Sequence, residues 1–268
     1  MLVTHGRVDQ VADGVERVLA LGRELGVELV IDAEEATKHG LEPQGDPYGA
    51  DVAIVLGGDG TMLRALNRFL GTGVPVLGVN FGRVGFLCTV AREELEPGLR
   101  RAFEGELQSV ELATLDVQVN GDSFVAVNDA VVTSGHLGRM IELEWAAGDE
   151  DLGRIPCDGL ICSTPSGSTA YNLSNGGPVL MWGIDAMATT FVAPHSLHAR
   201  PLVVSRGCDL RIWNRTTGIA ATVLVDGHVV GEVTTDERVV VKLGSRFSLL
   251  GTLPGSTFVT RYRRVFSA

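Results

Sequence analysis

Lysine is almost absent from this chain of 268 residues, which contains only Lys38 and Lys242. Neither lysine follows a glycine-rich loop, so the sequence has no Walker-type P-loop, whose lysine contacts bound phosphates. It also lacks the strand lysine and the His-Arg-Asp segment of protein kinases. Any phosphate chemistry here must therefore rely on backbone amides, arginine or a metal ion.

Cysteines and long apolar stretches are also scarce. The four cysteines form no CxxC pair, which is typical of free thiols in a reducing compartment. No apolar run reaches the length of a membrane span, and the first residues lack the basic-then-apolar pattern of a signal peptide. We therefore expect a cytoplasmic protein that has no membrane partner.

Acidic residues outnumber basic ones, and the net charge is −11. Such a chain repels the phosphates of nucleic acids and of anionic membranes. We therefore expect small molecules, and no nucleic acid, as partners. With 45% hydrophobic residues, a chain of this length can bury a large core and form two domains.

The first part of the chain alternates between helical and extended patterns. Apolar residues at helical spacing predict helices over residues 11–25 and 62–70. Apolar runs predict strands over residues 27–31, 51–56 and 74–79. This β-α-β order predicts an α/β domain over residues 1–108, with a Rossmann-like, doubly wound parallel sheet.

From about residue 109 the pattern changes to short alternating runs. They predict strands over residues 115–119, 124–132, 141–145, 160–163, 189–193, 210–213, 223–225, 229–233 and 238–243. Asp226 and Gly227 stand between two of these runs and are typical of a hairpin turn. Residues 109–246 are therefore predicted to form an all-β domain that is β-sandwich-like.

The pentapeptide Gly-Gly-Asp-Gly-Thr, residues 57–61, follows a predicted strand and begins a predicted helix. Its glycines allow a sharp turn that presents several backbone amides, and the helix N-terminus adds a partial positive charge. These features suit a phosphate group. Asp59 instead suits the alcohol that accepts a phosphoryl group, because a carboxylate can orient or deprotonate a hydroxyl. The simpler alternative is a tight turn in which Asp59 caps the helix.

A second informative stretch covers residues 158–179, DGLICSTPSGSTAYNLSNGGPV. It begins with Asp158 and a buried-strand pattern, and it continues with small hydroxyl residues, glycines and Tyr171. Such a segment can surround a small polar ligand with hydrogen-bonding groups and close backbone approaches. Together with residues 57–61 it indicates a nucleotide ligand.

Residues 57–61 are shared by NAD kinases, by diacylglycerol and sphingosine kinases and, in a serine variant, by 6-phosphofructokinases. Four further stretches distinguish among these families: GVNFGRVGFL at 78–87, VNDAVV at 127–132, the run at 158–179, and PHSLHARPLV at 194–203. In this order they resemble the prokaryotic-type NAD kinases over roughly residues 50 to 230.

The resemblance implies transfer of the γ-phosphate of ATP, or of a phosphate from polyphosphate, to the 2′-hydroxyl of the adenosine ribose of NAD, giving NADP. It implies Mg²⁺ as the metal that accompanies ATP. Relatives form homodimers or homotetramers in which a neighbouring subunit helps to build the site, so we expect an oligomer. The family also implies that residues 109–246 bind the dinucleotide and that residues 247–268 return to the first domain.

The resemblance assigns roles to individual residues as well. Asp59 matches the catalytic carboxylate, and Asp158 matches a contact to the nicotinamide side of the substrate. Asn128 and Asp129 match the pair at the diphosphate-ribose region, although most relatives have Glu at the second place. No residue is assigned to a metal, and the implied substrate-binding set is Asp59, Gly60, Arg64, Asn128, Asp129, Arg139, Asp158, Thr169, Ala170, Tyr171, Asn172, Leu173, Ser174 and His228.

Two alternatives remain open at this point. A lipid or sugar kinase would use the same pentapeptide, although a lipid acceptor favours an apolar pocket over a hydroxyl-rich one. A non-catalytic NAD- or NADP-binding homologue would keep the fold, and two departures from the family pattern, Asp129 and Pro156, are compatible with it. His195 and His198 do not form a zinc site, because no cysteine or second carboxylate cluster accompanies them.

Overall fold

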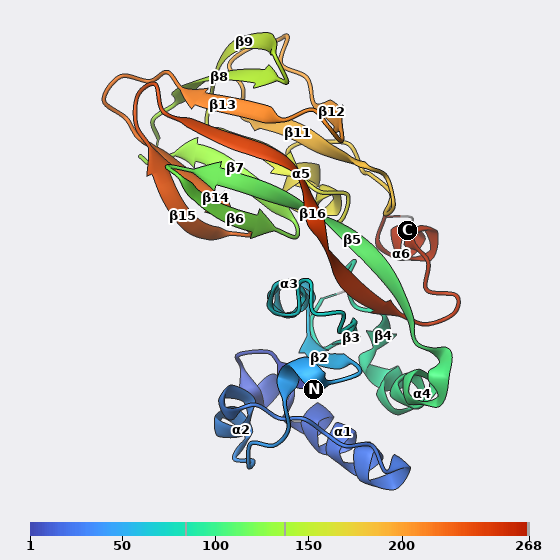
Figure 1. Ribbon diagram of the computed structural model, residues 1–268. Coiled ribbons are helices and arrows are strands. Elements are labelled where there is room, and N and C mark those ends of the chain that lie inside the picture. The colour runs from blue at the N-terminus through green and yellow to red at the C-terminus, as the bar shows by residue number, and fades with distance from the viewer. Residues whose placement is uncertain (84, 137, 267–268) are drawn as a thin grey trace. The chain divides into compact units, whose positions relative to one another are not determined.

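The computed structural model describes residues 1–83, 85–136 and 138–266 (Figure 1). Contacts within the chain divide it into two compact units. Unit 1 consists of Met1–Glu111 together with Ser248–Ala268, and unit 2 is the intervening Leu112–Phe247. The C-terminal segment therefore packs with the first part of the chain.

Unit 1 consists of short strands connected by helices. Its strands are β1 (Leu2–Thr4), β2 (Ala53–Gly57), β3 (Val76–Asn80) and β4 (Val90–Ala91). Its helices are α1 (Ala12–Leu25), α2 (Ala33–His39), α3 (Asp59–Arg68), α4 (Leu95–Arg101) and, from the C-terminal segment, α6 (Phe258–Phe266). Short 3₁₀ turns occur at Val8–Gln10, Pro47–Gly49 and Arg92–Glu94, and a π-helical turn at Ala102–Glu106.

The strands of unit 1 pair in parallel in the order β1-β2-β3, and β4 pairs with β3. Val55 on β2 lies between Val3 on β1 and Gly78 on β3. The end of β16 (Arg238–Thr252) also joins β3 in parallel, through Leu250 and Val76. All residues of β2 are buried, as expected for a parallel strand that is covered on both faces. The predicted α/β character of this part is confirmed.

Helix α1 shows how the sequence pattern forms these elements. Val15, Val18 and Leu21 share one face and are buried in the core of unit 1. Burying each such side chain contributes about 1.5–3 kcal/mol relative to exposure. The helix ends at Gly26, whose φ of 65° lies in the left-handed region that favours glycine. Across the described residues, no helix is both long and apolar enough to span a bilayer.

The strand predicted over residues 27–31 is wrong. This segment makes one isolated bridge, between Ile31 and Gln44, and a single backbone bond from Leu2 to the carbonyl of Val30. It is confined between the end of α1 and Asp32, the N-cap of α2, whose side chain accepts a hydrogen bond from the amide of Glu35. With one bridge to Gln44 and one bond from Leu2, the backbone of this segment has no continuous partner strand, so no ladder forms.

Unit 2 is built mainly from strands. They are β5 (Gln108–Val119), which begins in unit 1, β6 (Asp122–Ala126), β7 (Asp129–Ser134), β8 (Ile141–Ala147), β9 (Glu150–Cys157), β10 (Gly159–Ser163), β11 (Ala186–Val192), β12 (Leu202–Ser205), β13 (Leu210–Asn214), β14 (Ala221–Val225), β15 (His228–Val233) and most of β16. A 3₁₀ turn at Gly167–Thr169 leads into the single turn of α5 (Tyr171–Ser174). The β-rich character predicted for this part is confirmed.

The strands of unit 2 form two antiparallel groups (Figure 1). One is a six-stranded sheet in the order β12-β11-β10-β7-β14-β15. In the other, β16, β13, β8 and β9 follow one another, and β5 pairs with β16 and β6. One core contains residues from both groups, including Leu143 and Ile212 from one and Leu160 and Val223 from the other.

The run predicted as one strand over residues 124–132 consists of two strands, because β6 ends at Ala126 and β7 begins at Asp129. The amides of Val127 and Asn128, which separate them, donate to the carboxylate of Asp226. The predicted hairpin turn is present. Asp226 and Gly227 have φ values of 49° and 80°, the left-handed pair of a type I′ turn.

Three of the four thiols are buried. Burial raises the pKa of Cys88, Cys157 and Cys162 to about 12 in each case. These thiols are therefore protonated at neutral pH, and the nucleophilic thiolate is suppressed. The cysteines pack as small apolar groups.

Candidate functional site

The pentapeptide at residues 57–61 forms the junction between β2 and α3. Gly57 ends the buried strand, and Gly58 is the extended N-cap residue of the helix. Gly57 packs so closely on Thr61 that an added Cβ would lie 2.5 Å from the Thr61 hydroxyl oxygen. Asp59, in the first turn of α3, follows a fully buried strand and so has a well-defined backbone position.

Two backbone amides hold the carboxylate of Asp59. Phe86 N–H donates to Oδ2 at 2.6 Å, and Leu87 N–H donates to Oδ1 at 3.0 Å. Gly85 is required beside them, because an added Cβ would lie 2.3 Å from Oδ1 of Asp59. Gly58 is the N-cap residue and no side chain caps α3, so the Asp59 carboxylate does not cap the helix and instead joins α3 to a loop that follows β3. Val84, within the sequence motif at 78–87, lies outside the described residues.

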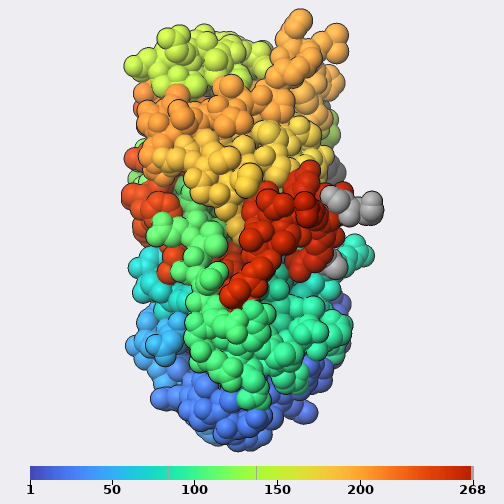
Figure 2. All heavy atoms as spheres, turned by 90° about the vertical axis from the view of Figure 1, so that its right-hand side faces the viewer, coloured from blue at the N-terminus to red at the C-terminus, as the bar shows by residue number. Residues whose placement is uncertain are grey.

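An arginine from α6 holds the same loop from the other end of the chain. The Arg261 side chain is 2% exposed, and its Nη1 donates to the carbonyls of Phe86 and Leu87 at 2.8 Å each. Its Nη2 donates to the Thr89 hydroxyl at 2.7 Å. Burial lowers the pKa of Arg261 to about 10, so it stays charged at neutral pH. In Figure 2 the red C-terminal residues lie directly against blue-green residues of the same unit.

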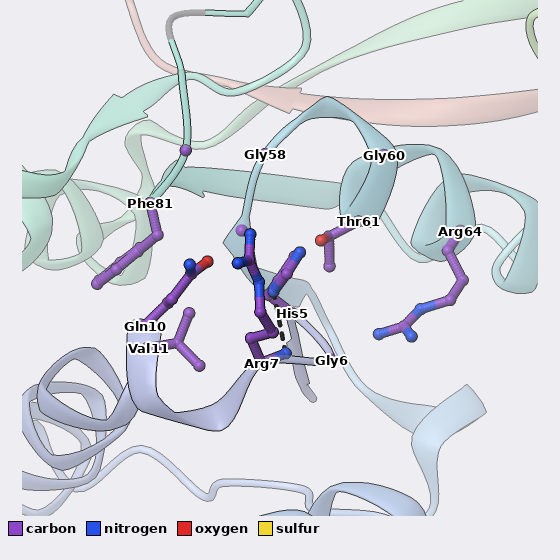
Figure 3. A pocket seen from close by; sticks show the side chains of 12 residues that line it. His5, Gly6, Arg7, Gln10, Val11, Gly58, Gly60, Thr61, Arg64 and Phe81 are labelled. Carbon is purple, nitrogen blue, oxygen red and sulfur yellow. Dashed lines mark hydrogen bonds between the residues drawn. The ribbon is translucent and has the colours of Figure 1, made fainter.

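A cavity of about 330 Å³ opens beside the pentapeptide within unit 1 (Figure 3). Gly58 and Gly60 line it from the pentapeptide, and His5 and Arg7 line it from the segment after β1. Arg64, one turn into α3, completes its basic lining. Asp59 is not among the lining residues, because its carboxylate is bonded to the amides of Phe86 and Leu87.

Arg64 occupies a defined position at this cavity. Its Nη2 donates to the carbonyl of Thr4 at 2.6 Å, and its side chain remains 49% exposed. The buried carboxylate of Glu35 lies 3.9 Å away and is also bonded by Lys38 and by the amide and hydroxyl of Thr4. Arg64 was predicted from the sequence, whereas His5 and Arg7 were not, because neither falls in a recognisable motif.

A second cluster forms within unit 2 at one end of the six-stranded sheet. Asn128 and Asp129 lead into β7, and the end of β10 lies beside them because Ser163 pairs with Asp129. Thr164 N–H donates to the carbonyl of Asn128 at 2.9 Å. Gly167 approaches the same carbonyl so closely that an added Cβ would lie 2.1 Å from it. The sheet thus joins the 127–132 motif to the 158–179 run.

Asp226 organises this cluster, and sequence reasoning treated it only as a turn residue. Its carboxylate accepts hydrogen bonds from three consecutive amides, those of Val127, Asn128 and Asp129, at 2.8, 2.7 and 3.1 Å. The residue Asp129 is 7% exposed. Burial, reinforced by the charge of Asp226, raises the pKa of Asp129 to about 7. The available sequence signal for Asp226 was the Asp226-Gly227 pair, which indicates a turn.

Two buried polar atoms in this cluster have no hydrogen-bond partner among the described residues. They are the amide oxygen of Asn128 and the hydroxyl oxygen of Ser166, which lies in the loop after β10. An unsatisfied buried polar atom costs about 1–3 kcal/mol, so such atoms are often completed by a ligand. Ser166 was not singled out from the sequence, since its run contains many similar hydroxyls.

The predicted segment from Thr169 to Ser174 combines exposed and buried side chains. Tyr171 is 46% exposed, whereas Asn172 is wholly buried. The Asn172 amide nitrogen donates to the carbonyls of Ser168 and Pro178, and its oxygen accepts from the Thr190 hydroxyl. The side chain of Asn172 therefore holds the loop, while Tyr171 is accessible. Thr169, Ala170, Leu173 and Ser174 are partly or fully exposed.

The remaining predicted residues divide between the two ends of β7. His228 begins β15, and its ring nitrogen Nδ1 lies 3.1 Å from the carbonyl of Asp226, at the Asp129 end. Asp158 lies at the opposite end, since its carbonyl accepts from the amide of Ser134. Arg139, in the connection after β7, belongs to that opposite end as well. The six residues of β7 separate the two ends by about 16 Å.

Within the described residues, no group of three or more His, Cys, Asp or Glu side chains is arranged to hold a metal ion. His195 and His198 are exposed residues of the connection between β11 and β12. Arg154, the basic residue two positions before Pro156, donates to the carboxylate of Glu144 at 2.6 Å. That ion pair lies on neighbouring strands β8 and β9.

Two family models match the chain. The ATP-NAD kinase N-terminal domain matches residues 15–107, and the ATP-NAD kinase C-terminal domain matches residues 127–249. Together they cover most of both units, and all of the predicted site positions, from Asp59 to His228, fall within them. Those two models were built for consecutive parts of one kind of protein, in the order found here.

Curated relatives and solved structures give the same result. The chain is 37% identical over 219 residues to the NAD kinase of Gemmatimonas aurantiaca, covering 80% of this chain and 76% of the relative. It is 34% identical to the NAD kinase of Leifsonia xyli subsp. xyli, covering 100% of this chain and 93% of the relative. An NAD kinase from Archaeoglobus fulgidus in complex with ATP matches at a TM-score of 0.75 and 25% identity, over 99% and 96% of the two chains. Yeast NADH kinase complexed with NADH shares the fold, with a TM-score of 0.87 and 19% identity over 99% of this chain and 86% of that one. The chain belongs to the NAD kinase family.

Proposed function

We propose that this chain transfers the γ-phosphate of ATP to the 2′-hydroxyl of the adenosine ribose of NAD, producing NADP. The observation that carries the proposal is the Asp59 carboxylate, held by the amides of Phe86 and Leu87 at a glycine-rich junction in a member of the NAD kinase family. Curated NAD kinases match over most of the chain, which supports this activity over that of a lipid or sugar kinase.

Asp59 is proposed as the general base. A hydroxyl attacks phosphorus efficiently only when its proton is removed or its lone pair is oriented, and a carboxylate within hydrogen-bond reach does both. The two amides occupy one lone pair on each oxygen of Asp59. Each carboxylate oxygen retains a further acceptor position for the 2′-hydroxyl.

The acceptor dinucleotide is assigned to the cluster in unit 2 on the basis of its unsatisfied atoms. The buried amide oxygen of Asn128 can accept from a ribose hydroxyl, and the Ser166 hydroxyl can donate or accept. Tyr171 is accessible for stacking on a base. The other proposed substrate contacts in this cluster are Asp129, His228 and the segment from Thr169 to Ser174. In the pentapeptide, Gly60 is proposed as a further contact.

Asp158 and Arg139 lie a strand length from Asn128 within one chain. We assign them to the dinucleotide site of a neighbouring subunit, which accounts for their family role without requiring one ligand to contact both ends of β7. Homodimers or homotetramers are the proposed assembly. The four cysteines are free, which suits a reducing cytoplasm as the location.

Mg²⁺ is proposed to arrive with ATP. In kinase sites Mg²⁺ is held largely by the phosphates of the substrate, and no residue of this chain is assigned to it. When bound, the metal neutralises charge on the transferring phosphoryl group. The residues around the pentapeptide would hold the donor itself through amides and arginine.

The finer description of the fold is also a proposal. The parallel pairing of β1, β2, β3 and β4 supports a Rossmann-like, doubly wound sheet in unit 1. The single core shared by two antiparallel groups supports a β-sandwich-like unit 2. The functional domains would then be residues 1–108, residues 109–246 and a C-terminal segment from residue 247.

Replacement of Asp59 by Asn tests the assigned chemistry. The substitution keeps size and removes the basic carboxylate, so we expect kcat for NADP formation to fall by at least about a hundredfold. NADP is measured in a coupled assay with ATP and Mg²⁺, and circular dichroism verifies that the variant is folded. Near-normal turnover in a folded Asp59→Asn variant would contradict the role of Asp59. A wild-type chain that binds NAD without Mg²⁺-dependent turnover would instead identify a non-catalytic homologue.

A further inference from the structure

A second cavity of unit 1, with a volume of about 390 Å³, lies between β4, α4 and the C-terminal segment that carries α6. Val90 and Pro97 line it from the first two elements, and Leu253 and Pro254 line it from the C-terminal segment. Among the described residues, those of the pentapeptide take no part in its lining. Its volume falls in the lower part of the range of small-molecule sites, about 300–1,000 Å³. The cavity is therefore separate from the proposed substrate contacts and suits a small ligand.

Arginines give this second cavity a positive lining. Arg101 on α4 and both Arg261 and Arg264 on α6 line it, and Glu94 is the single acidic residue among its described lining residues. Three cations against one carboxylate form a local positive region in a chain whose net charge is −11. Such a region concentrates anions from solution.

Two of these arginines keep hydrogen-bond donors for a ligand. Arg101 donates to the Glu106 carboxylate through Nε and Nη2, and its Nη1 has no bond to a described residue. Within the described part of the chain, Arg264 bonds only through Nη2, to the carbonyls of Gly85 and Cys88 at 3.1 and 3.3 Å. The planar donors of a guanidinium match the oxygens of a carboxylate or a phosphate group.

Apolar side chains determine the remaining chemistry of the ligand. Val90 and Leu253 are buried, and Pro97 and Pro254 extend the apolar part of the lining. Such walls gain free energy when they cover the hydrocarbon part of a ligand, which an inorganic ion does not have. The lining thus fits a small organic acid, in which a carboxylate or phosphate group is attached to an apolar body.

The cavity shares its arginines with the loop that holds Asp59. Arg261 and Arg264 are one turn apart on α6, and both donate to backbone carbonyls of residues 85–88. Two amides of the same loop bond to the Asp59 carboxylate. An anion that bonds to the Arg264 guanidinium competes with the loop carbonyls for its N–H groups. Occupation of the cavity therefore weakens the attachment of this loop to α6.

Resting on the proposed function, we infer that this cavity binds a small organic acid, and that the bound acid slows phosphoryl transfer by releasing the loop that orients Asp59. Arg101 and Arg264 supply the ionic contacts. The two states of the loop are the one bonded to Arg264 and the one without that bond, and the acid favours the second. The cavity is a regulatory site, because its lining contains no proposed substrate contact.

Titration calorimetry with the whole chain tests the site without turnover. The probes are cyclohexanecarboxylate and cyclohexyl phosphate, which carry the two acid groups on one apolar ring, with uncharged cyclohexanol as the reference. We expect at least one acid to bind about tenfold more tightly than cyclohexanol, and Arg101→Gln and Arg264→Gln each to weaken its binding about tenfold. The matched controls are Arg100→Gln and Arg263→Gln, which lie beside these residues in sequence and outside the cavity, and both should bind the acid as wild type does.

Steady-state kinetics of NADP formation test the coupling to Asp59. At saturation the bound acid should lower kcat by at least about fivefold and leave the KM values for ATP and NAD within about twofold. Arg101→Gln should keep the uninhibited rate of wild type and require about tenfold more acid for the same inhibition.

Three results would overturn the inference: competition of the acid with ATP or NAD, an unchanged kcat at saturating acid, or equal affinity in wild type and both folded cavity variants. Failure of both acids to bind more tightly than cyclohexanol would also overturn it. A wild-type chain that makes no NADP but binds the acid through Arg101 and Arg264 would refute the proposed function and leave the anion site in place.

Discussion

The carboxyl groups of Asp226 and Asp129 lie close together at the start of β7, and they differ in their hydrogen bonding and in their pKa. The Asp226 carboxylate accepts hydrogen bonds from three consecutive backbone amides. Asp129 is buried beside it, and its pKa is raised to about 7 chiefly by burial. The first residue of β7 therefore carries a carboxyl group whose pKa lies near neutral pH.

The raised pKa of Asp129 makes stability depend on pH. Its stabilising contribution is fully present below about pH 4, the ordinary pKa of an aspartate, and is lost as the pH rises through about 7. Asp129→Asn stays neutral and should remove this loss, so its stability relative to wild type should increase between pH 5 and pH 8 by on the order of 2 kcal/mol.

Urea unfolding at the two pH values measures this difference. All three tryptophans, Trp145, Trp182 and Trp213, lie in unit 2 with Asp129, so their fluorescence reports on that unit. An equal effect of the Asn substitution at pH 5 and pH 8 would show that Asp129 does not titrate between them.

At the scale of secondary structure, α6 connects the end of the chain to the proposed base. Arg261 donates to the carbonyls of Phe86 and Leu87, while the amides of the same residues donate to Asp59. Phe258 on α6 also packs edge-on against Phe86, with ring centroids 5.1 Å apart. The orientation of Asp59 therefore depends on a helix about 200 residues away in sequence.

We expect Arg261→Met to lower kcat by about tenfold or more, because the loop that orients Asp59 loses a buried cation. KM values for NAD and ATP should change by less than about threefold, since Arg261 is a positioning residue that contacts neither proposed substrate subsite. Arg261→Lys should recover part of kcat. Arg263→Met, at an exposed position on the same helix, is the control.

Steady-state kinetics per folded molecule, with folding followed by circular dichroism, distinguish positioning from general stability. Normal kcat in the remaining folded Arg261→Met protein would show that Arg261 serves the fold alone. Equal losses in Arg261→Met and Arg263→Met would contradict a specific link to Asp59.

At the scale of the whole molecule, the proposed dinucleotide residues do not meet at one place in a single chain. Asp158 and Arg139 lie at one end of β7, and Asn128 and Asp129 lie at the other. A closed symmetric oligomer can bring the two ends together from different subunits. The proposed assembly is therefore part of the proposed site.

Mixed oligomers test this arrangement. Asp59→Asn and Asp158→Ala, coexpressed with different tags, should each be inactive alone but form active heterodimers. One of the two sites in such a heterodimer combines an intact Asp59 with an intact Asp158, so activity should reach about half that of wild type. Heterodimers purified through both tags and assayed for NADP formation give the measurement. Inactivity in well-folded heterodimers would show that Asp158 and Asp59 of one chain serve the same site.

Local sequence pattern accounts for much of the fold. The helical spacing of Val15, Val18 and Leu21 predicts α1, and the Asp226-Gly227 pair predicts a turn that the structure contains. The segment over residues 27–31 failed because apolar composition does not reveal whether a partner strand has room to pair. The region of α6 offered no motif to connect it with the loop at residues 85–89.

The sequence by itself determined the family, the two kinds of architecture and the position of Asp59, because these depend on contiguous motifs and on periodicity. Tertiary structure decided which distant groups meet. Arg261 meets the loop that holds Asp59, Asp226 meets the amides of Asn128 and Asp129, and Arg7 lines one cavity with Gly58 and Gly60. It also decided that Asp158 lies apart from Asn128 in one chain. Such pairings follow from strand register and helix packing over long sequence separations, which local residue spacing does not encode.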